Sequence, residues 1–190
     1  QCPIFYNHFT TGRPKKVDDI AHSHYNSSYK DTLNAPLYPF GYGLSYTTFE
    51  YSDLQLSSPT ITPNQHMQVS CKVTNTGNRE GDEVVQVYLR DVLSSVTTYE
   101  KNLVGFERVH LKPGESKTLN FTINRRDMQL LNLDDNWVVE PGEFKVMIGA
   151  SSEDIRLNGT YTVVAYGESN HLPAASQKKP DVIASSESES

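Results

Sequence analysis

Runs of alternating apolar and polar residues fill the middle of the chain. In residues 67–74 every odd position is apolar and every even position is polar. Successive side chains of a strand point to opposite faces, so this pattern predicts a strand with one buried face and one solvated face. Residues 85–90, 119–123 and 144–148 repeat it. We predict that the inward positions of these runs form the core, namely Val69, Cys71, Val73, Val85, Val87, Leu89, Leu119, Phe121, Ile123, Phe144, Val146 and Ile148.

Turn sequences separate these runs. Residues 75–82 read NTGNREGD, residues 112–115 read KPGE, and a second Pro-Gly pair stands at Pro141-Gly142. About seven strands at a spacing of ~8–12 residues are typical of an antiparallel sandwich. We therefore predict an all-β, immunoglobulin-like sandwich over residues 48–164. The Cys…Trp…Cys pattern of antibody domains is absent, which favours the fibronectin type III branch.

The two ends of the chain have a different character. Residues 10–34 are polar and lack periodicity, whereas residues 35–49 combine two prolines, two glycines and five aromatic residues, which excludes a helix. We predict an irregular arm over residues 1–47 that leans on the sandwich or on a partner and favours self-association if its rings are exposed. The chain opens without an initiating Met, so we expect it to be part of something longer. Residues 165–190, rich in Ser, Pro, Lys and Glu, are predicted to be a disordered tail.

Composition and motifs narrow the function. The formal net charge of the 190 residues is −6, which argues against a nucleic-acid partner. Apolar runs are too short to span a bilayer, so we expect no membrane partner. The sequence has no CxxC, HExxH, Walker or GxGxxG motif, so we predict neither a metal site nor a cofactor. His22 and His24 are interpreted as loop residues, and Cys71 as a buried free thiol.

Several long segments carry a family resemblance. The string PLYPFGYGLSYTTFEY at residues 36–51 closely resembles the segment that leads into the C-terminal fibronectin type III-like domain of family 3 glycoside hydrolases, the β-glucosidases and β-xylosidases. Residues 73–91, 101–123 and 137–157 are similar to that domain in the same order. Residues 1–14 resemble the end of the α/β sandwich domain that precedes it in the family. The resemblance implies a parent enzyme that hydrolyses terminal β-D-glucosyl or β-D-xylosyl residues and is periplasmic or secreted.

Catalytic residues are not carried over by the resemblance. The family's nucleophile is an aspartate in a Ser-Asp-Trp-type motif of a preceding barrel, and here the only Trp, Trp137, follows Asp135-Asn136. The family's acid/base glutamate lies upstream of the matching region. Retaining glycosidases also need two carboxyls about 5–5.5 Å apart. The adjacent acidic pairs of this chain, at residues 18–19, 134–135 and 153–154, lie in loop-like segments and are interpreted as solvated.

We therefore predict a non-catalytic accessory domain whose partners are the catalytic domains of the parent enzyme. The residues expected to pack between domains are Tyr38, Phe40, Gly41, Tyr42, Gly43 and Tyr46. Trp137 is a candidate for sugar contact, and an oligosaccharide is a candidate partner. A carbohydrate-binding module is the first alternative, and it requires exposed aromatic rings on one face. A self-sufficient glycosidase is the second, and the missing carboxylate motifs argue against it.

Overall fold

The computed structural model describes residues 4–9 and 35–165, and this part of the chain is almost entirely β-structure. It contains three strands of only two residues, β2 (Thr60–Ile61), β7 (Leu130–Leu131) and β8 (Trp137–Val138), and a one-turn helix, α1 (Arg125–Met128). The strands of eight or more residues are β1 (Phe49–Leu56), β3 (Met67–Asn75), β4 (Gly81–Asp91), β5 (Asn102–Leu111), β6 (Ser116–Ile123), β9 (Gly142–Gly149) and β10 (Ile155–Val163). The prediction of about seven strands in an all-β fold is confirmed.

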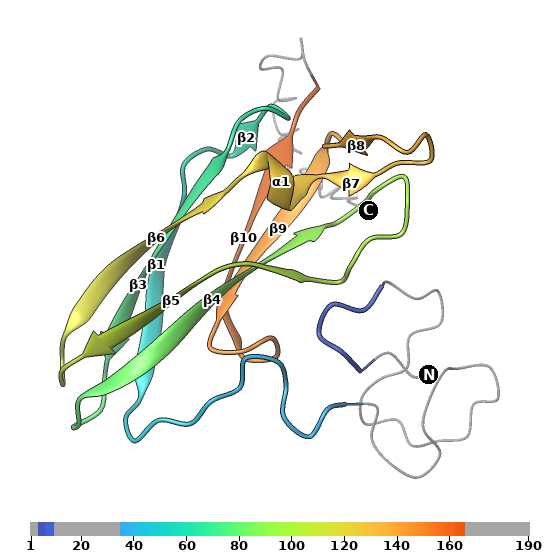
Figure 1. Cartoon of the computed structure of the whole chain (residues 1–190). Helices are drawn as coiled ribbons and strands as arrows, with labels where there is room; N and C mark the ends of the chain where they lie inside the picture. Colours follow the sequence, from blue (N-terminus) through green and yellow to red (C-terminus); the bar gives the residue numbers. More distant parts are fainter. Residues whose placement is uncertain (1–3, 10–34, 166–190) are drawn as a thin grey trace, which may run out of the picture.

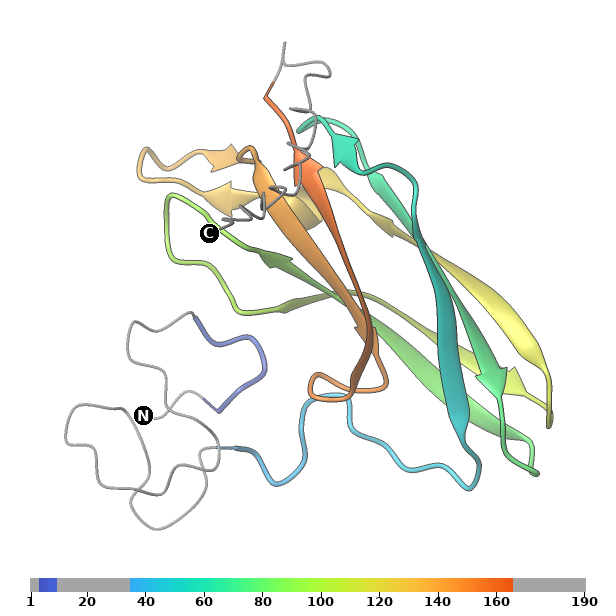
Figure 2. The same cartoon turned by 180° about the vertical axis from the view of Figure 1, so that it is seen from behind.

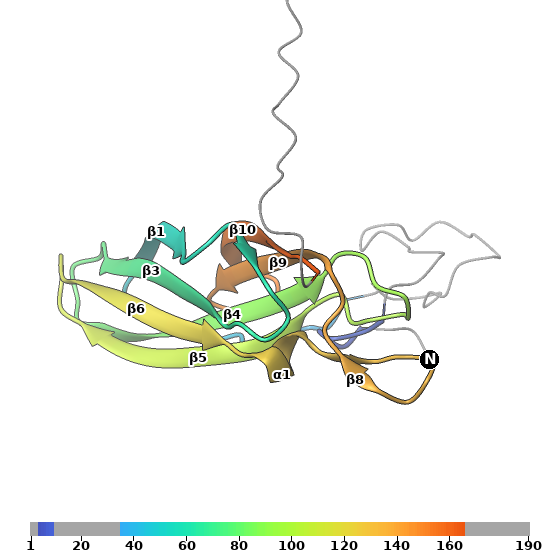
Figure 3. The same ribbon diagram turned by 90° about the horizontal axis from the view of Figure 1, so that it is seen from above.

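The strands form two packed layers (Figures 1 and 3). One sheet has the order β1-β3-β6 and the other the order β2-β10-β9-β4-β5. Neighbouring strands are antiparallel, apart from the short parallel pair β2 and β10. The hairpin β7–β8 forms a third, small sheet beside α1 at one end of the sandwich. This two-layer architecture is the one that the alternating runs predict.

The core lies between the layers. It contains most of the predicted residues, together with nine that were not predicted, namely Tyr51, Ile61, Met67, Val109, Leu111, Met128, Val139, Tyr161 and Val163. Eleven of the twelve predicted side chains are buried, whereas Phe121 packs against the core while remaining partly exposed. Cys71 is buried and free, and burial raises the pKa of its thiol to about 11. Fully burying one side chain of the Val, Leu or Phe type contributes about 1.5–3 kcal/mol, so these positions supply much of the driving force for folding.

A bulge in β1 explains why its apolar residues do not keep one alternation. Phe49 and Tyr51 share one parity, whereas Leu54 and Leu56 share the other. The pairing of β1 with β3 shifts register between Ser52 and Gln55, at the point where Asp53 has a φ of 53°. The extra residue lets both halves of the strand direct apolar side chains toward the core.

The outer face of β4 differs from the sequence expectation. The alternation in residues 85–90 places Gln86 and Tyr88 on the polar, outward side of the strand, yet their exposed fractions are 3% and 0%. They are buried because segments before β1 contact them: Gln86 donates a hydrogen bond to Gly41, and Tyr6 packs edge-on against Tyr88. Figure 2 shows from behind how the chain passes the β9–β10 turn before it enters β1. Periodicity within one strand cannot reveal a cover that comes from 45 residues away.

Two parts of the sequence interpretation lie outside the described residues. These are the polar stretch 10–34, with His22 and His24, and the predicted disordered tail beyond residue 165. The division into an arm, a sandwich and a tail therefore stays a prediction. Within the described ranges, no helix is both long enough and apolar enough to cross a membrane.

Candidate functional site

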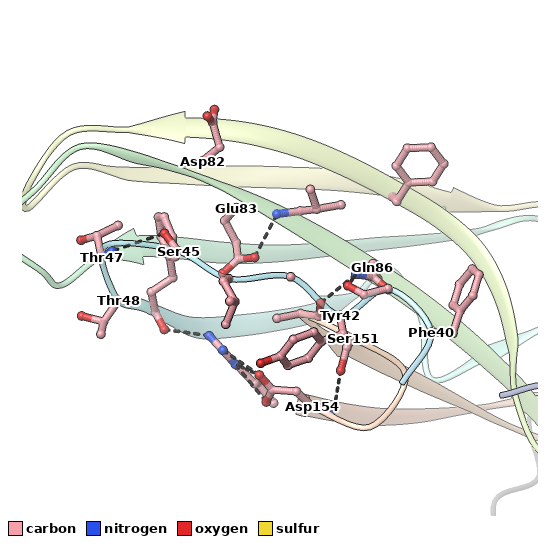
Figure 4. A pocket seen from close by; sticks show the side chains of 18 of the residues that line it. Phe40, Tyr42, Ser45, Thr47, Thr48, Asp82, Glu83, Gln86, Ser151 and Asp154 are labelled. Atoms are coloured by element: carbon pink, nitrogen blue, oxygen red, sulfur yellow. Dashed lines mark hydrogen bonds and ion pairs between the residues drawn. The ribbon is translucent and has the colours of Figure 1, made fainter. Parts of the chain in front are cut away.

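Residues 35–48, called the strap below, bind the outer face of the five-stranded sheet through one buried side chain. The amide nitrogen of Gln86 donates hydrogen bonds to the carbonyls of Gly41 (3.1 Å) and Ala150 (2.7 Å). The hydroxyl of Tyr88 donates to the amide oxygen of Gln86 (2.5 Å). Figure 4 shows Gln86 beside the strap. A buried amide with both ends satisfied holds the strap in one position.

Gly41 is required at this joint for two reasons. Its φ is 78°, in the left-handed region that a residue with a Cβ rarely adopts. A Cβ at Gly41 would also overlap the side chain of Gln86. Gly43 has neither constraint, because a Cβ there would meet no atom within 4 Å. Of the two predicted strap glycines, the fold therefore requires glycine at position 41 but not at position 43.

Residues 4–9 support the strap from the other side. The ring of Tyr6 stacks on Phe40 with centroids 4.1 Å apart and meets Tyr88 edge-on at 6.0 Å. The backbone of Ser152, in the turn between β9 and β10, donates a hydrogen bond to the carbonyl of Phe40 (2.9 Å). Phe40 is thus packed and hydrogen-bonded at once, and this half of the strap is fixed to the domain.

The second anchor holds the C-terminal end of the strap. The hydroxyl of Thr47 donates to the side-chain oxygen of Asn75 (2.7 Å). The side-chain nitrogen of Asn75 donates to the carbonyls of Arg79 (2.8 Å) and Leu111 (2.9 Å). Asn75 is completely buried, so it joins the strap, the β3–β4 turn and the end of β5 in a region that water does not reach.

The strap presents large apolar side chains to solvent, both before its first anchor at Phe40–Gly41 and between that anchor and Thr47. The exposed fractions are 92% for Tyr46, 89% for Leu44, 88% for Leu37 and 66% for Tyr38. The rings of Tyr38 and Tyr42 lie 5.4 Å apart. Isolated exposed apolar residues are ordinary, but a group of them on one hydrogen-bonded segment is typical of an interaction surface. This group is called the strap surface below.

A cavity of about 590 Å³ lies between the strap and the start of β4 (Figure 4). Three carboxyls line it, from Asp82, Glu83 and Asp154. The last of these is held by the Arg156 guanidinium at 2.7 Å, and the first by Arg108 at 2.9 Å. Glu83 is the carboxyl of this cavity that has no basic side chain within ion-pair distance in the described part of the chain.

The carboxyl of Glu83 has a different environment from the other two. Burial raises the pKa of Glu83, and the Val84 N–H that it binds at 2.9 Å opposes that shift. The other two carboxyls of the cavity, those of Asp82 and Asp154, form ion pairs with arginines.

Trp137 lies at the opposite end of the sandwich from the Asn75 anchor. It belongs to β8, has an exposed fraction of 59%, and lines a separate cavity of about 260 Å³. Asp91 lines the same cavity, and burial raises the pKa of its carboxyl to about 6. Asp134 and Asp135, in the turn before β8, are exposed. The structure does not bring Trp137 together with the strap residues.

Sequence reasoning missed four residues that shape these sites, namely Asn75, Gln86, Tyr88 and Asp91. Gln86 and Tyr88 anchor the strap, and nothing in the local pattern marks them, because their partners come from other segments. Asp91 had a detectable signal, since it continues the inward parity of Val87 and Leu89 with a carboxyl group. Across residues 4–9 and 35–165, no group of three His, Cys, Asp or Glu side chains is arranged to hold a metal ion.

Comparisons with known proteins agree on one region of one group of enzymes. Residues 83–152 match the family described as the fibronectin type III-like domain. The chain is 47% identical over 156 residues to the periplasmic β-glucosidase of Salmonella typhimurium, covering 82% of this chain and 20% of that protein. It is 50% identical over 125 residues to a β-xylosidase of Formosa agariphila, covering 66% of this chain and 17% of that protein.

A solved structure shows the same likeness. A β-glucosidase from Listeria innocua, a D270A variant in complex with laminaribiose, is 37% identical and superposes with a TM-score of 0.77. The match covers 86% of this chain and 22% of that one. The chain thus spans about a fifth of the length of the relatives that it matches.

Proposed function

Because the chain is a fibronectin type III-like domain that belongs to the C-terminal region of family 3 β-glucosidases and β-xylosidases, we propose that it is a non-catalytic accessory domain of such an enzyme. Its role is to bind the catalytic domains through the strap surface and to stabilise them. The parent reaction is hydrolysis of terminal β-D-glucosyl or β-D-xylosyl residues. The relative from Salmonella typhimurium is named periplasmic, which supports a periplasmic or secreted location.

One observation carries this proposal. The strap is fixed to the sandwich at Gly41 and at Thr47 by buried side chains, yet most of its own large apolar side chains are left in water. If no partner covered the strap, the side chains of Leu44 and Tyr46 could turn inward, or be replaced by polar ones, at little cost to the stability of the domain. A rigid display of apolar groups is the arrangement expected of a surface that a second body covers. The predicted interdomain residues Tyr38, Phe40, Tyr42 and Tyr46 all belong to this segment.

A chimera tests this role. The matching region of the Salmonella typhimurium β-glucosidase is replaced by this chain, and the chimera is assayed on an aryl β-glucoside. We expect it to fold and to hydrolyse the substrate. The double variant Leu44→Ser, Tyr46→Ser should lower the midpoint of thermal inactivation of the chimera by several degrees. The reason is that each buried apolar side chain contributes about 1.5–3 kcal/mol.

The matched control is Leu133→Ser, because Leu133 is 86% exposed but lies in the β7–β8 turn. It should leave the inactivation midpoint of the chimera unchanged. Neither set of changes should alter the melting temperature of the 190-residue chain by itself, since these side chains are solvated there. A chimera that tolerates the strap variants as well as it tolerates Leu133→Ser contradicts the proposal. If the free chain self-associates and the strap variants abolish this association, the result would support an exposed apolar interaction surface on the strap.

The purified chain should not hydrolyse aryl β-glucosides or β-xylosides above the rate in buffer. An oxocarbenium-like transition state needs a nucleophilic carboxylate and a proton donor on opposite sides of one sugar. The strap cavity offers Glu83 but no free second carboxylate. Asp135→Asn, which removes the carboxyl nearest in sequence to Trp137, should change nothing. Turnover by the wild-type chain that a single carboxyl substitution abolishes would make it an enzyme in its own right.

A further inference from the structure

The cavity beside Trp137 opens at the end of the sandwich where several elements meet. α1, the β7–β8 hairpin and the loop between β4 and β5 gather at this end (Figure 1). The cavity measures about 260 Å³. Leu89, Met128 and Phe144 line it and are almost completely buried, so its floor belongs to the domain core. A floor built from core residues is preformed and does not depend on a mobile loop.

Aromatic rings stand at the rim of this cavity. Trp137 has an exposed fraction of 59% and Tyr99 one of 38%. The ring of Tyr99 is held in place by stacking on Phe9, with centroids 4.6 Å apart and an angle of 16°. The backbone bridge between Phe9 and Tyr99 fixes the same contact. The rim therefore presents ordered, flat, apolar faces to a ligand.

One carboxyl that lines the cavity, that of Asp91, has an oxygen atom without a hydrogen-bond partner among the described residues. Asp91 lies two residues beyond the core residue Leu89 and thus on the same inward face of β4. Its Oδ1 atom is buried and accepts no hydrogen bond from any described residue. A buried carboxylate oxygen without a partner costs free energy, and the described residues supply no donor to it. Asp127 cannot share this role fully, since its Oδ2 accepts from the Asn124 N–H at 2.7 Å.

We propose that this cavity binds one pyranose ring of a neutral saccharide, with the C–H face of the ring on Trp137 and a sugar hydroxyl donating to Asp91. The volume lies just below the roughly 300–1,000 Å³ of pockets that take drug-sized ligands, which suits one ring rather than a chain. The site makes the domain a sugar-binding element as well as a structural one. It shares no residue with the strap surface, so each proposal can fail without the other.

The lining favours a saccharide over other ligands. A pyranose combines apolar ring faces with hydroxyl donors at its edge, which matches aromatic walls beside a carboxylate. An anion would be repelled by Asp91 and Asp127, which both line the cavity. A purely apolar ligand would leave the Oδ1 atom of Asp91 without a donor. Asn102 and Gln129 also line the cavity and add neutral polar groups to it.

Trp137 is the only tryptophan of the chain, so its fluorescence reports directly on this site. The 190-residue chain is titrated at pH 7.5 with glucose, xylose and cellobiose, and with sorbitol as an open-chain polyol control. We expect a saturable change with at least one cyclic sugar, with a dissociation constant in roughly the millimolar range, as befits a small ligand. Sorbitol should produce no saturable change, because it has hydroxyls but no rigid ring.

Variants locate the site, and amide chemical shifts measure binding where the tryptophan is removed. Trp137→Ala and Asp91→Ala should each weaken binding about tenfold or more. Trp137 is exposed, so its replacement should leave the fold intact. Phe106→Ala is the matched control, because Phe106 is 67% exposed on β5 and does not line the cavity. The proposal is overturned if none of the three sugars binds saturably, if sorbitol gives an equal response, or if Asp91→Ala and Trp137→Ala bind sugar as tightly as the wild type.

Discussion

Replacing Asn75 by alanine is expected to lower the free energy of unfolding by about 3–5 kcal/mol. The side chain of Asn75 is completely buried and takes part in four hydrogen bonds, with Thr47, Gly77, Arg79 and Leu111. With alanine at position 75, the backbone groups of Gly77, Arg79 and Leu111 would lose their hydrogen-bond partner in a region that water reaches poorly. Each buried polar group left unpaired costs about 1–3 kcal/mol.

The effect of Asn75→Ala should extend beyond one contact. The same residue links the strap, the β3–β4 turn and the end of β5, and its backbone also bonds with Glu115 and Gly114 in the β5–β6 turn. For a domain of this size, a loss of that magnitude corresponds to a fall in melting temperature of about 10 °C or more. Calorimetry or thermal dichroism of the 190-residue chain measures it.

Asn78→Ala provides the comparison for this measurement. Asn78 is the same residue type three positions later, but it is exposed and makes no side-chain hydrogen bond among the described residues. We expect its replacement to change stability by no more than about 0.5 kcal/mol. Equal effects of the two substitutions would show that the buried joint contributes nothing specific.

Asp91→Asn is expected to stabilise the protein near neutral pH and not at acidic pH. Burial raises the pKa of the Asp91 carboxyl from 3.8 to about 6, and a nearby Glu140 adds to this shift. The N–H of Leu93 donates to the carboxyl and lowers it in part. Asp127 and the buried hydroxyl of Tyr161 are the other titratable groups close to it. Asparagine keeps the shape of the side chain and carries no charge.

The direction of the pKa shift of Asp91 determines how its contribution to stability changes with pH. Because the folded-state pKa lies above the unfolded value, the contribution of Asp91 to stability is fully present below about pH 3.9 and is lost as the pH rises through 6. The wild type therefore carries a penalty of at most about 3 kcal/mol at pH 7.5. The variant carries none, so the difference between the two proteins should be largest at pH 7.5 and vanish near pH 4.

Urea unfolding of both proteins at pH 4, 6 and 7.5 measures this difference, since titrations elsewhere in the chain cancel between them. Glu143→Gln serves as the control, because Glu143 is an exposed carboxyl in the neighbouring strand β9. Its effect should not vary with pH in the same way. A destabilised Asp91→Asn variant at pH 7.5, or a difference that is constant with pH, would mean that the carboxyl is charged and well accommodated.

The sandwich itself could be predicted because the alternation within each strand indicates which of its faces is buried. In β3 the alternation of Val69, Cys71 and Val73 with polar residues admits one buried face, and a shift by one residue would reverse it. Turn sequences rich in Gly and Pro then set where each strand ends. The bulge in β1 also has a signal in the sequence, because the apolar positions change parity between Tyr51 and Leu54.

The strap could be predicted only as a segment. Its prolines, glycines and rings exclude a helix and indicate a chain lying on a surface. The sequence did not reveal that Phe40 faces Tyr6, that Gly41 faces Gln86, or that Tyr46 remains in solvent. An irregular segment has no period that assigns a side to each residue, so its partners depend on which surface the rest of the chain offers.

By itself, then, the sequence determined the class of fold, the long strands, about half of the core, and the family to which the domain belongs. Only the tertiary structure decided that Gln86 and Tyr88 are buried, that Asn75 joins three segments, and that Asp91 faces a cavity beside Trp137. The physical reason is the range of the interactions. Alternation and turn propensity act between near neighbours, whereas burial of a polar group depends on segments that are distant in the chain and meet only after folding.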